Sequence, residues 1–159
     1  MATVTGGAGV AAAMAKIQEL VTNASVVNVG FLREATYPDG KPVAMIAAIQ
    51  NFGAPRRNIP PRPFFTTMIK VESPGWAPLI AVQLVKTKYD AAKTMERVGA
   101  ALKGQLQKSI RTGPWKPLAA STLAGRRARY KGKGKGKHDK PLIDTGHMLN
   151  SVDWIVEKL

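Results

Sequence analysis

The residue types that could perform acid–base or metal chemistry are few and scattered in this sequence. The ten acidic residues show no paired spacing, and the two histidines, His138 and His147, stand in no HExxH or other metal-ligand pattern. Cysteine is absent, which excludes disulfides, thiolate metal sites and cysteine nucleophiles. The sequence therefore predicts a protein that is not an enzyme and that holds no metal and no cofactor.

One short motif, Asp144-Thr145-Gly146, is similar to the Asp-Thr-Gly of aspartic proteases. That chemistry needs two such loops facing each other on a β-rich scaffold. We interpret Asp144 or Thr145 instead as the capping residue of a short helix, and the neighbouring His147 as a surface or core-packing residue and not a catalytic base.

Positive charge is the strongest signal in the composition. The net charge is +14, and residues 111–140 alone contain ten basic residues and one acidic residue. Residues 131–140 include a strict Lys-Gly alternation, which predicts a flexible cationic loop without a fold of its own. Such a field attracts polyanions without selecting one. Candidate contacts to DNA or to an acidic partner are Arg126, Arg127, Arg129, Lys131, Lys133, Lys135 and Lys137. A solvated loop that only keeps the protein soluble is the alternative.

The elements that must position these residues follow from hydrophobic periodicity. We expect a single α+β domain over residues 1–159, with a flexible N-terminal arm over residues 1–7. Spacing of three and four predicts helices over residues 8–22, 43–52, 64–71 and 121–129, and β-branched and aromatic runs predict strands over residues 26–32 and 154–156. The longest pattern, from Trp76 to Ile110, predicts one long amphipathic helix, bent at Gly99 or Gly104 or packed partly on other subunits. The shorter helices would pack with it on a small antiparallel sheet.

A proline-rich segment, residues 59–65, predicts a stiff connection between two packed elements. Its three prolines restrict the backbone to one extended path, and Pro63 precedes a predicted helix start. Arg62 lies between prolines, where it has little reason to serve core packing, so we expect an exposed side chain. An ordinary proline-rich connector is the simpler interpretation of these residues alone.

The order of several motifs resembles the tailed-phage virion morphogenesis proteins, a family of neck or tail-completion proteins. The resemblance covers residues 43–156 and rests on the joint occurrence of its motifs. Such families often have an acidic residue where this chain has Asn51, a departure that bears on any salt bridge expected there. The motifs are Ile49-Gln50-Asn51-Phe52-Gly53, Ile59-Pro60-Pro61-Arg62-Pro63-Phe64-Phe65, Gly113-Pro114-Trp115-Lys116-Pro117-Leu118 with Ser121-Thr122-Leu123, and Pro141-Leu142-Ile143-Asp144-Thr145-Gly146-His147-Met148-Leu149-Asn150-Ser151.

The resemblance implies a structural virion protein that forms a homo-oligomeric ring, expected to be a hexamer, in the phage neck. Such a ring joins the head connector or adaptor to the tail tube or tail terminator, and genomic DNA passes through its channel. It implies assembly in the host cytoplasm and no membrane association. Candidate contacts to other subunits or partners are Phe52, Arg62, Phe64, Phe65 and Trp115. Two alternatives stay open, a free-standing basic nucleic-acid-binding protein and, with little support from the residues, a basic hydrolase or nuclease.

Overall fold

The computed structural model describes residues 9–12, 14, 15, 19, 24–131 and 139–158. The described residues of the helix predicted over residues 8–22 are helical, and their side chains are exposed. The rest of that helix, the arm predicted over residues 1–7 and most of the loop predicted over residues 131–140 lie outside the described residues.

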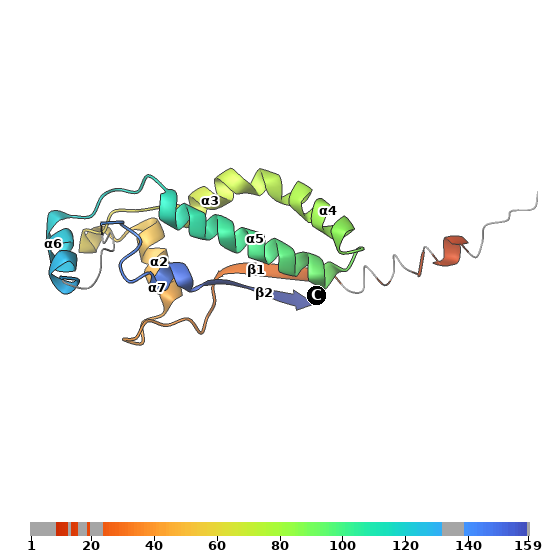
Figure 1. Cartoon of the computed structure of the whole chain (residues 1–159), viewed down its shortest axis with the longest axis horizontal. Helices are drawn as coiled ribbons and strands as arrows, with labels where there is room; N and C mark the ends of the chain where they lie inside the picture. The colour runs from red at the N-terminus through yellow and green to blue at the C-terminus, as the bar shows by residue number, and fades with distance from the viewer. Residues whose placement is uncertain (1–8, 13, 16–18, 20–23, 132–138, 159) are drawn as a thin grey trace, which may run out of the picture.

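Two strands far apart in the sequence form the sheet. β1 (Ser25–Phe31) pairs antiparallel with β2 (Val152–Lys158), and the register places Val29 opposite Trp154. The helix α5 lies along this sheet, with α3 and α4 on the opposite side of α5 (Figure 1). The predicted α+β class, with a long helix packed on a small antiparallel sheet, is confirmed. The helices are α2 (Val43–Phe52), α3 (Phe64–Glu72), α4 (Trp76–Lys86), α5 (Ala91–Thr112), α6 (Ala120–Arg129) and α7 (His147–Asn150), with 3-10 turns at Pro55–Arg57 and Ser73–Gly75.

The single long helix predicted from Trp76 to Ile110 is wrong. The chain turns between α4 and α5, where Lys88 and Tyr89 adopt left-handed φ values of 56° and 66°. Asp90 then begins α5 as its N-cap, and its side chain accepts a hydrogen bond of 2.9 Å from the backbone N–H of Lys93. The three-and-four pattern continues across the break because both segments are helical and α4 packs against α5 in the hairpin that they form.

The predicted bends at Gly99 and Gly104 are also wrong, since both glycines lie inside the continuous helix α5. Gly99 has a packing role instead. A Cβ at this position would collide with the ring of Trp154 and would stand 2.9 Å from the Cγ2 of Val27, whereas a Cβ on Gly104 would meet nothing within 4 Å. Gly99 therefore lets the sheet approach the helix closely.

The core lies at the end of the molecule where α2, α3, α5 and α7 meet. Phe64 on α3 is fully buried and meets Phe31 of β1 edge to face, with ring centroids 6.3 Å apart. The segment that follows the loop predicted over residues 131–140 enters this core through Leu142. The buried cluster contains Val43, Ala47, Phe64, Met68, Leu106, Ile110, Leu142, Met148 and Val152.

Candidate functional site

The proline-rich connection is fixed to its neighbours by side chains from other elements. Pro63, the residue before α3, has no side chain that could cap the helix. Asn51 of α2 provides the acceptor instead, because its Oδ1 receives the backbone N–H of Phe65 at 2.9 Å and that of Thr66 at 3.4 Å. Asn51 is only 4% exposed. The residue that departs from the acidic pattern of the resembling family thus has a capping role here.

Arg62 is buried, which corrects the prediction that its side chain is exposed. Its side chain is 5% exposed, and it crosses between two segments of the chain. The Nε donates to the carbonyl of Lys116 at 3.0 Å, and one terminal nitrogen donates to the Oε1 of Gln50, also at 3.0 Å. The guanidinium therefore connects α2 to the segment that follows α5, because its planar fork can serve two acceptors at once.

The four aromatic residues predicted as contacts separate into different environments. Phe64 is part of the core and cannot reach another molecule, so its assignment as a contact residue is wrong. Trp115 is half-buried, and its Nε1 donates to the carbonyl of Ser109 at 3.2 Å. Phe52 is 70% exposed, and with the half-buried Phe65 it lines an apolar groove of about 350 Å³ beside β1. Phe52 and Phe65 remain available for a contact.

The three arginines of α6 also differ. Arg126 is buried, which does not fit the exposed cationic contact that the sequence predicts for it. Its Nη1 donates to the carbonyls of Lys140 and Ile143 at 2.9 and 3.0 Å. Arg129 remains more than half exposed but forms an ion pair of 2.9 Å with the Oδ2 of Asp144.

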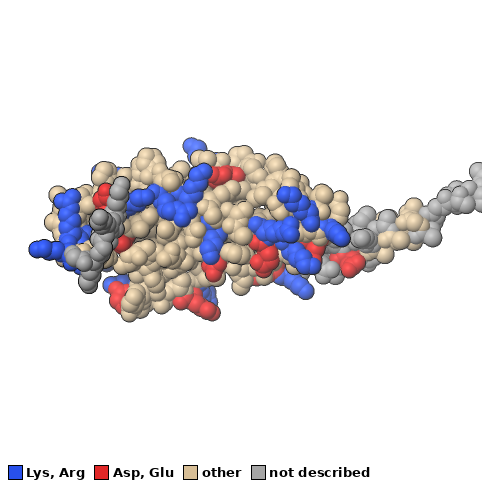
Figure 2. Space-filling model, in the orientation of Figure 1, with Lys and Arg blue, Asp and Glu red and all other residues tan. Residues whose placement is uncertain are grey.

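Three of the predicted cationic contacts are both exposed and placed by the structure, and Arg129 is the one of them that forms an ion pair with Asp144. Arg127 and Lys131 are exposed at the α6 end, where Lys and Arg side chains gather in Figure 2. Lys133, Lys135 and Lys137 lie outside the described residues.

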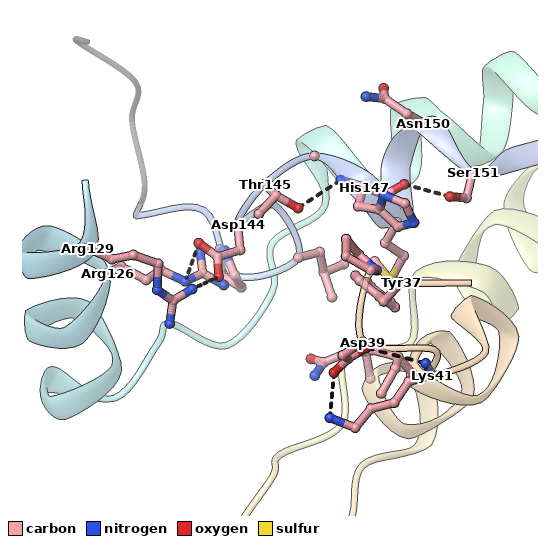
Figure 3. Close-up of a pocket in the computed structure, with 17 residues that line it drawn as sticks. Tyr37, Asp39, Lys41, Arg126, Arg129, Asp144, Thr145, His147, Asn150 and Ser151 are labelled. Carbon is pink, nitrogen blue, oxygen red and sulfur yellow. Dashed lines mark hydrogen bonds and ion pairs between the residues drawn. The ribbon is translucent and has the colours of Figure 1, made fainter. Parts of the chain in front are cut away.

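Asp144 is the centre of an ion-pair cluster, a role that the sequence interpretation missed. Figure 3 shows Arg126 and Arg129 both turned toward its carboxylate, and the Nε of Arg126 lies 3.5 Å from Oδ1. Thr145 does accept the backbone N–H of His147 at 3.2 Å, as the capping prediction requires, but the N-cap residue itself is Gly146. No local sequence signal links Asp144 to arginines 15 and 18 residues earlier, so the prediction could not have found this cluster.

A pocket of about 810 Å³ lies between this cluster and the loop before α2 (Figure 3). On its wall the ring of His147 packs on Tyr37 with centroids 4.7 Å apart, and its Nε2 lies 2.9 Å from the carbonyl of Thr36. Burial raises the pKa of Tyr37 above its ordinary value, and the carboxylates of Asp144 and Asp39 raise it further.

The acidic groups of this pocket are not arranged for proton transfer. A hydrogen bond from the Lys41 side chain lowers the pKa of Asp39, which keeps that carboxyl ionised, and Asp144 faces two guanidinium groups. A general acid needs the opposite shift, a pKa raised toward neutrality. Among the described residues, no three histidine or acidic side chains are grouped as a metal site would require.

Apolar side chains also gather on the outer surface of α3 and α4, which we call the α3–α4 face. It comprises Val71, Val82 and Val85, all of them exposed, and α4 has no fully buried residue. The signal was present in the sequence, since Trp76–Lys86 contains one charged residue and is apolar around its whole circumference. The interpretation of this segment as part of one long amphipathic helix hid the difference between α4 and α5.

Within the described parts of the chain, no helix is both long enough and apolar enough to cross a membrane. Comparisons with protein-family models, with curated proteins and with solved structures give no match for this chain.

Proposed function

We propose that this chain is a structural ring subunit of the neck of a tailed phage, joining the head connector to the tail tube around the DNA channel. Its work would be to present fixed surfaces to copies of itself and to adjoining virion proteins, and not to catalyse a reaction. The proposal begins from the motif resemblance described above.

The observation that supports it most is that the motifs of the resemblance, spread between residues 49 and 151, pack together at one end of the molecule. Arg62 joins the first three of them, through Gln50 and the carbonyl of Lys116. The last motif enters the same unit, because Leu142 and Met148 share the core cluster with Phe64. Motifs that occur together for a common structural reason are expected to meet in this way.

The exposed apolar surfaces provide a second support. The α3–α4 face and the groove beside Phe52 leave large apolar side chains in contact with water in the single chain. Large apolar side chains that stay exposed in a single chain are often covered in protein contacts, and a ring uses two different surfaces of each subunit in a head-to-tail contact. An apolar face on α4 and an apolar groove beside β1 are two such surfaces.

The experiment is to purify the full chain alone and with a phage tail-tube protein, and to measure mass by light scattering and shape by negative-stain electron microscopy. We expect closed rings in the presence of the tube protein. A monomer in both samples would contradict the proposal. Steep salt-dependent DNA binding by that monomer would instead favour the free-standing nucleic-acid-binding protein.

A matched pair of variants connects this test to the α3–α4 face. Val85 is 63% exposed, so Val85→Asp should leave the fold unchanged while placing a charge in any contact made there. Val85→Thr keeps the shape of the side chain and should keep the rings. Rings formed equally well by both variants would exclude this face from the contact.

A further inference from the structure

A second pocket lies on the other side of Arg126 from the pocket in Figure 3. It has a volume of about 690 Å³ and is enclosed by the proline-rich connection on one side and by the segment from Lys116 to Thr122 on the other. Its walls are largely apolar and stiff, because prolines from three separate segments line them. These prolines are Pro55, Pro60, Pro61, Pro117 and Pro141.

The buried side chain of Arg62 forms part of the wall of this pocket. Both of its hydrogen-bond acceptors, the Gln50 amide oxygen and the Lys116 carbonyl, are uncharged. Among the described residues, no carboxylate forms an ion pair with it. A guanidinium has five N–H donors. Among the described residues the Nη2 of Arg62 has no hydrogen-bond partner, and it is not sealed from solvent, so it is the nitrogen left to donate to a ligand in the pocket.

The charges around the pocket do not balance. Burial lowers the pKa of Arg62, and the positive charge of Arg126 lowers it further. The nearest acidic group of the cluster, Asp144, already serves both Arg126 and Arg129. A buried cation beside a second cation is costly unless an anion joins it.

We propose that this pocket binds the carboxylate of an acidic side chain on an extended segment of a partner protein, with Arg62 as the principal ligand. The volume exceeds what one small anion fills, and proline rings at the walls offer apolar surface to a peptide on either side of the carboxylate. A DNA phosphate is the weaker candidate, because a side chain that is 5% exposed can be reached by a slender group but not by a duplex backbone. The inference goes beyond the proposed function, since it concerns a ligand class and holds for any partner with such a segment.

The test is a titration of the full-length protein, at constant ionic strength, with acetyl-Ala-Glu-Ala-amide and with its glutamine counterpart. The readout is the ¹H–¹⁵N resonance of the Arg62 Nε, whose N–H is held by the Lys116 carbonyl. We expect a saturable shift with the glutamate peptide and about tenfold weaker binding of the glutamine peptide, because hydrogen bonds to charged groups are the stronger kind. Sodium acetate should give the same shift at higher concentration.

The control variant is Arg127→Gln, which removes an exposed arginine from α6 and should leave the titration unchanged. Arg62→Lys should weaken binding of the glutamate peptide, and if that variant does not fold, the wild-type resonance alone decides. Equal affinity for the two peptides, or no saturable shift with either, would overturn the proposal. Binding of inorganic phosphate or of a short oligonucleotide at Arg62 more tightly than the glutamate peptide would overturn it in favour of a phosphate site.

Discussion

Replacing Asn51 by alanine tests whether one side chain of α2 holds the start of α3. The substitution removes the acceptor of the Phe65 N–H at 2.9 Å, and the weaker contact to the exposed Thr66 at 3.4 Å. Loss of a helix cap costs about 1 kcal/mol, and leaving a partly buried N–H without a partner raises the total to about 2 kcal/mol. For a chain of this length, that loss lowers Tm by about 4–8 °C.

The assay is urea unfolding followed by circular dichroism, with thermal unfolding as a second measurement. Asn28→Ala is the matched control, because Asn28 undergoes the same chemical change at an exposed site, where its amide donates to Glu157 at 3.2 Å. The control should cost no more than about 0.5 kcal/mol. Asn51→Asp keeps an oxygen at the acceptor position and should recover part of the loss.

The capping argument would be refuted if Asn51→Ala were no more destabilising than Asn28→Ala. It would also fail if Asn51→Asp lost as much stability as the alanine variant, because the loss would then follow from packing around the amide group and not from the missing acceptor.

Three further predictions concern single side chains. Gly99→Ala should destabilise the protein by about 1–3 kcal/mol, because the added methyl group has no space under the sheet. Gly104→Ala should instead stabilise it by about 0.5–1 kcal/mol through helix propensity. Chemical unfolding measures both changes, and the same sign for both would contradict the packing role of Gly99. Asp144→Asn should lower the free energy of unfolding by about 2 kcal/mol, because it leaves the buried guanidinium of Arg126 without its charge partner. Asp153→Asn breaks only a surface ion pair and should change the free energy of unfolding by no more than about 0.5 kcal/mol. Thermal unfolding measures both. The pKa of Tyr37 is raised on folding, so its contribution to stability is present below about pH 10 and is lost as the pH rises through the folded pKa. Tyr37→Phe should remove that part of the alkaline loss of stability, as measured by unfolding experiments across this pH range. A pH profile that the substitution leaves unchanged would contradict this prediction.

Much of the secondary structure could be predicted because it depends on local pattern. The helix over residues 43–52 matches α2 at both ends, and β1 lies within one residue of the predicted strand. Periodicity identifies such elements since one face of each must be apolar. It could not locate the turn at Lys88 and Tyr89, because neither residue is the glycine or proline that usually marks a break.

The candidate site depended on partners that are distant in the sequence. Proline spacing predicted a stiff connection, but the direction in which Arg62 points is decided by acceptors at Gln50 and Lys116. In the same way, Arg126 turns inward because carbonyls of the segment before α7 and the carboxylate of Asp144 meet it there. The number of arginines in α6 gives its charge but does not tell on which side of the helix each arginine lies.

The sequence by itself determined the net charge and its distribution along the chain, the absence of cysteine chemistry and the positions of most helices and strands. These follow from residue types and short-range spacing. Only the tertiary structure decided which arginines are buried, that Asn51 caps a helix from another element, and that α4 turns an apolar face outward. Those features depend on contacts between segments more than ten residues apart. Hydrogen bonds and burial between such segments produce no periodic pattern in the sequence.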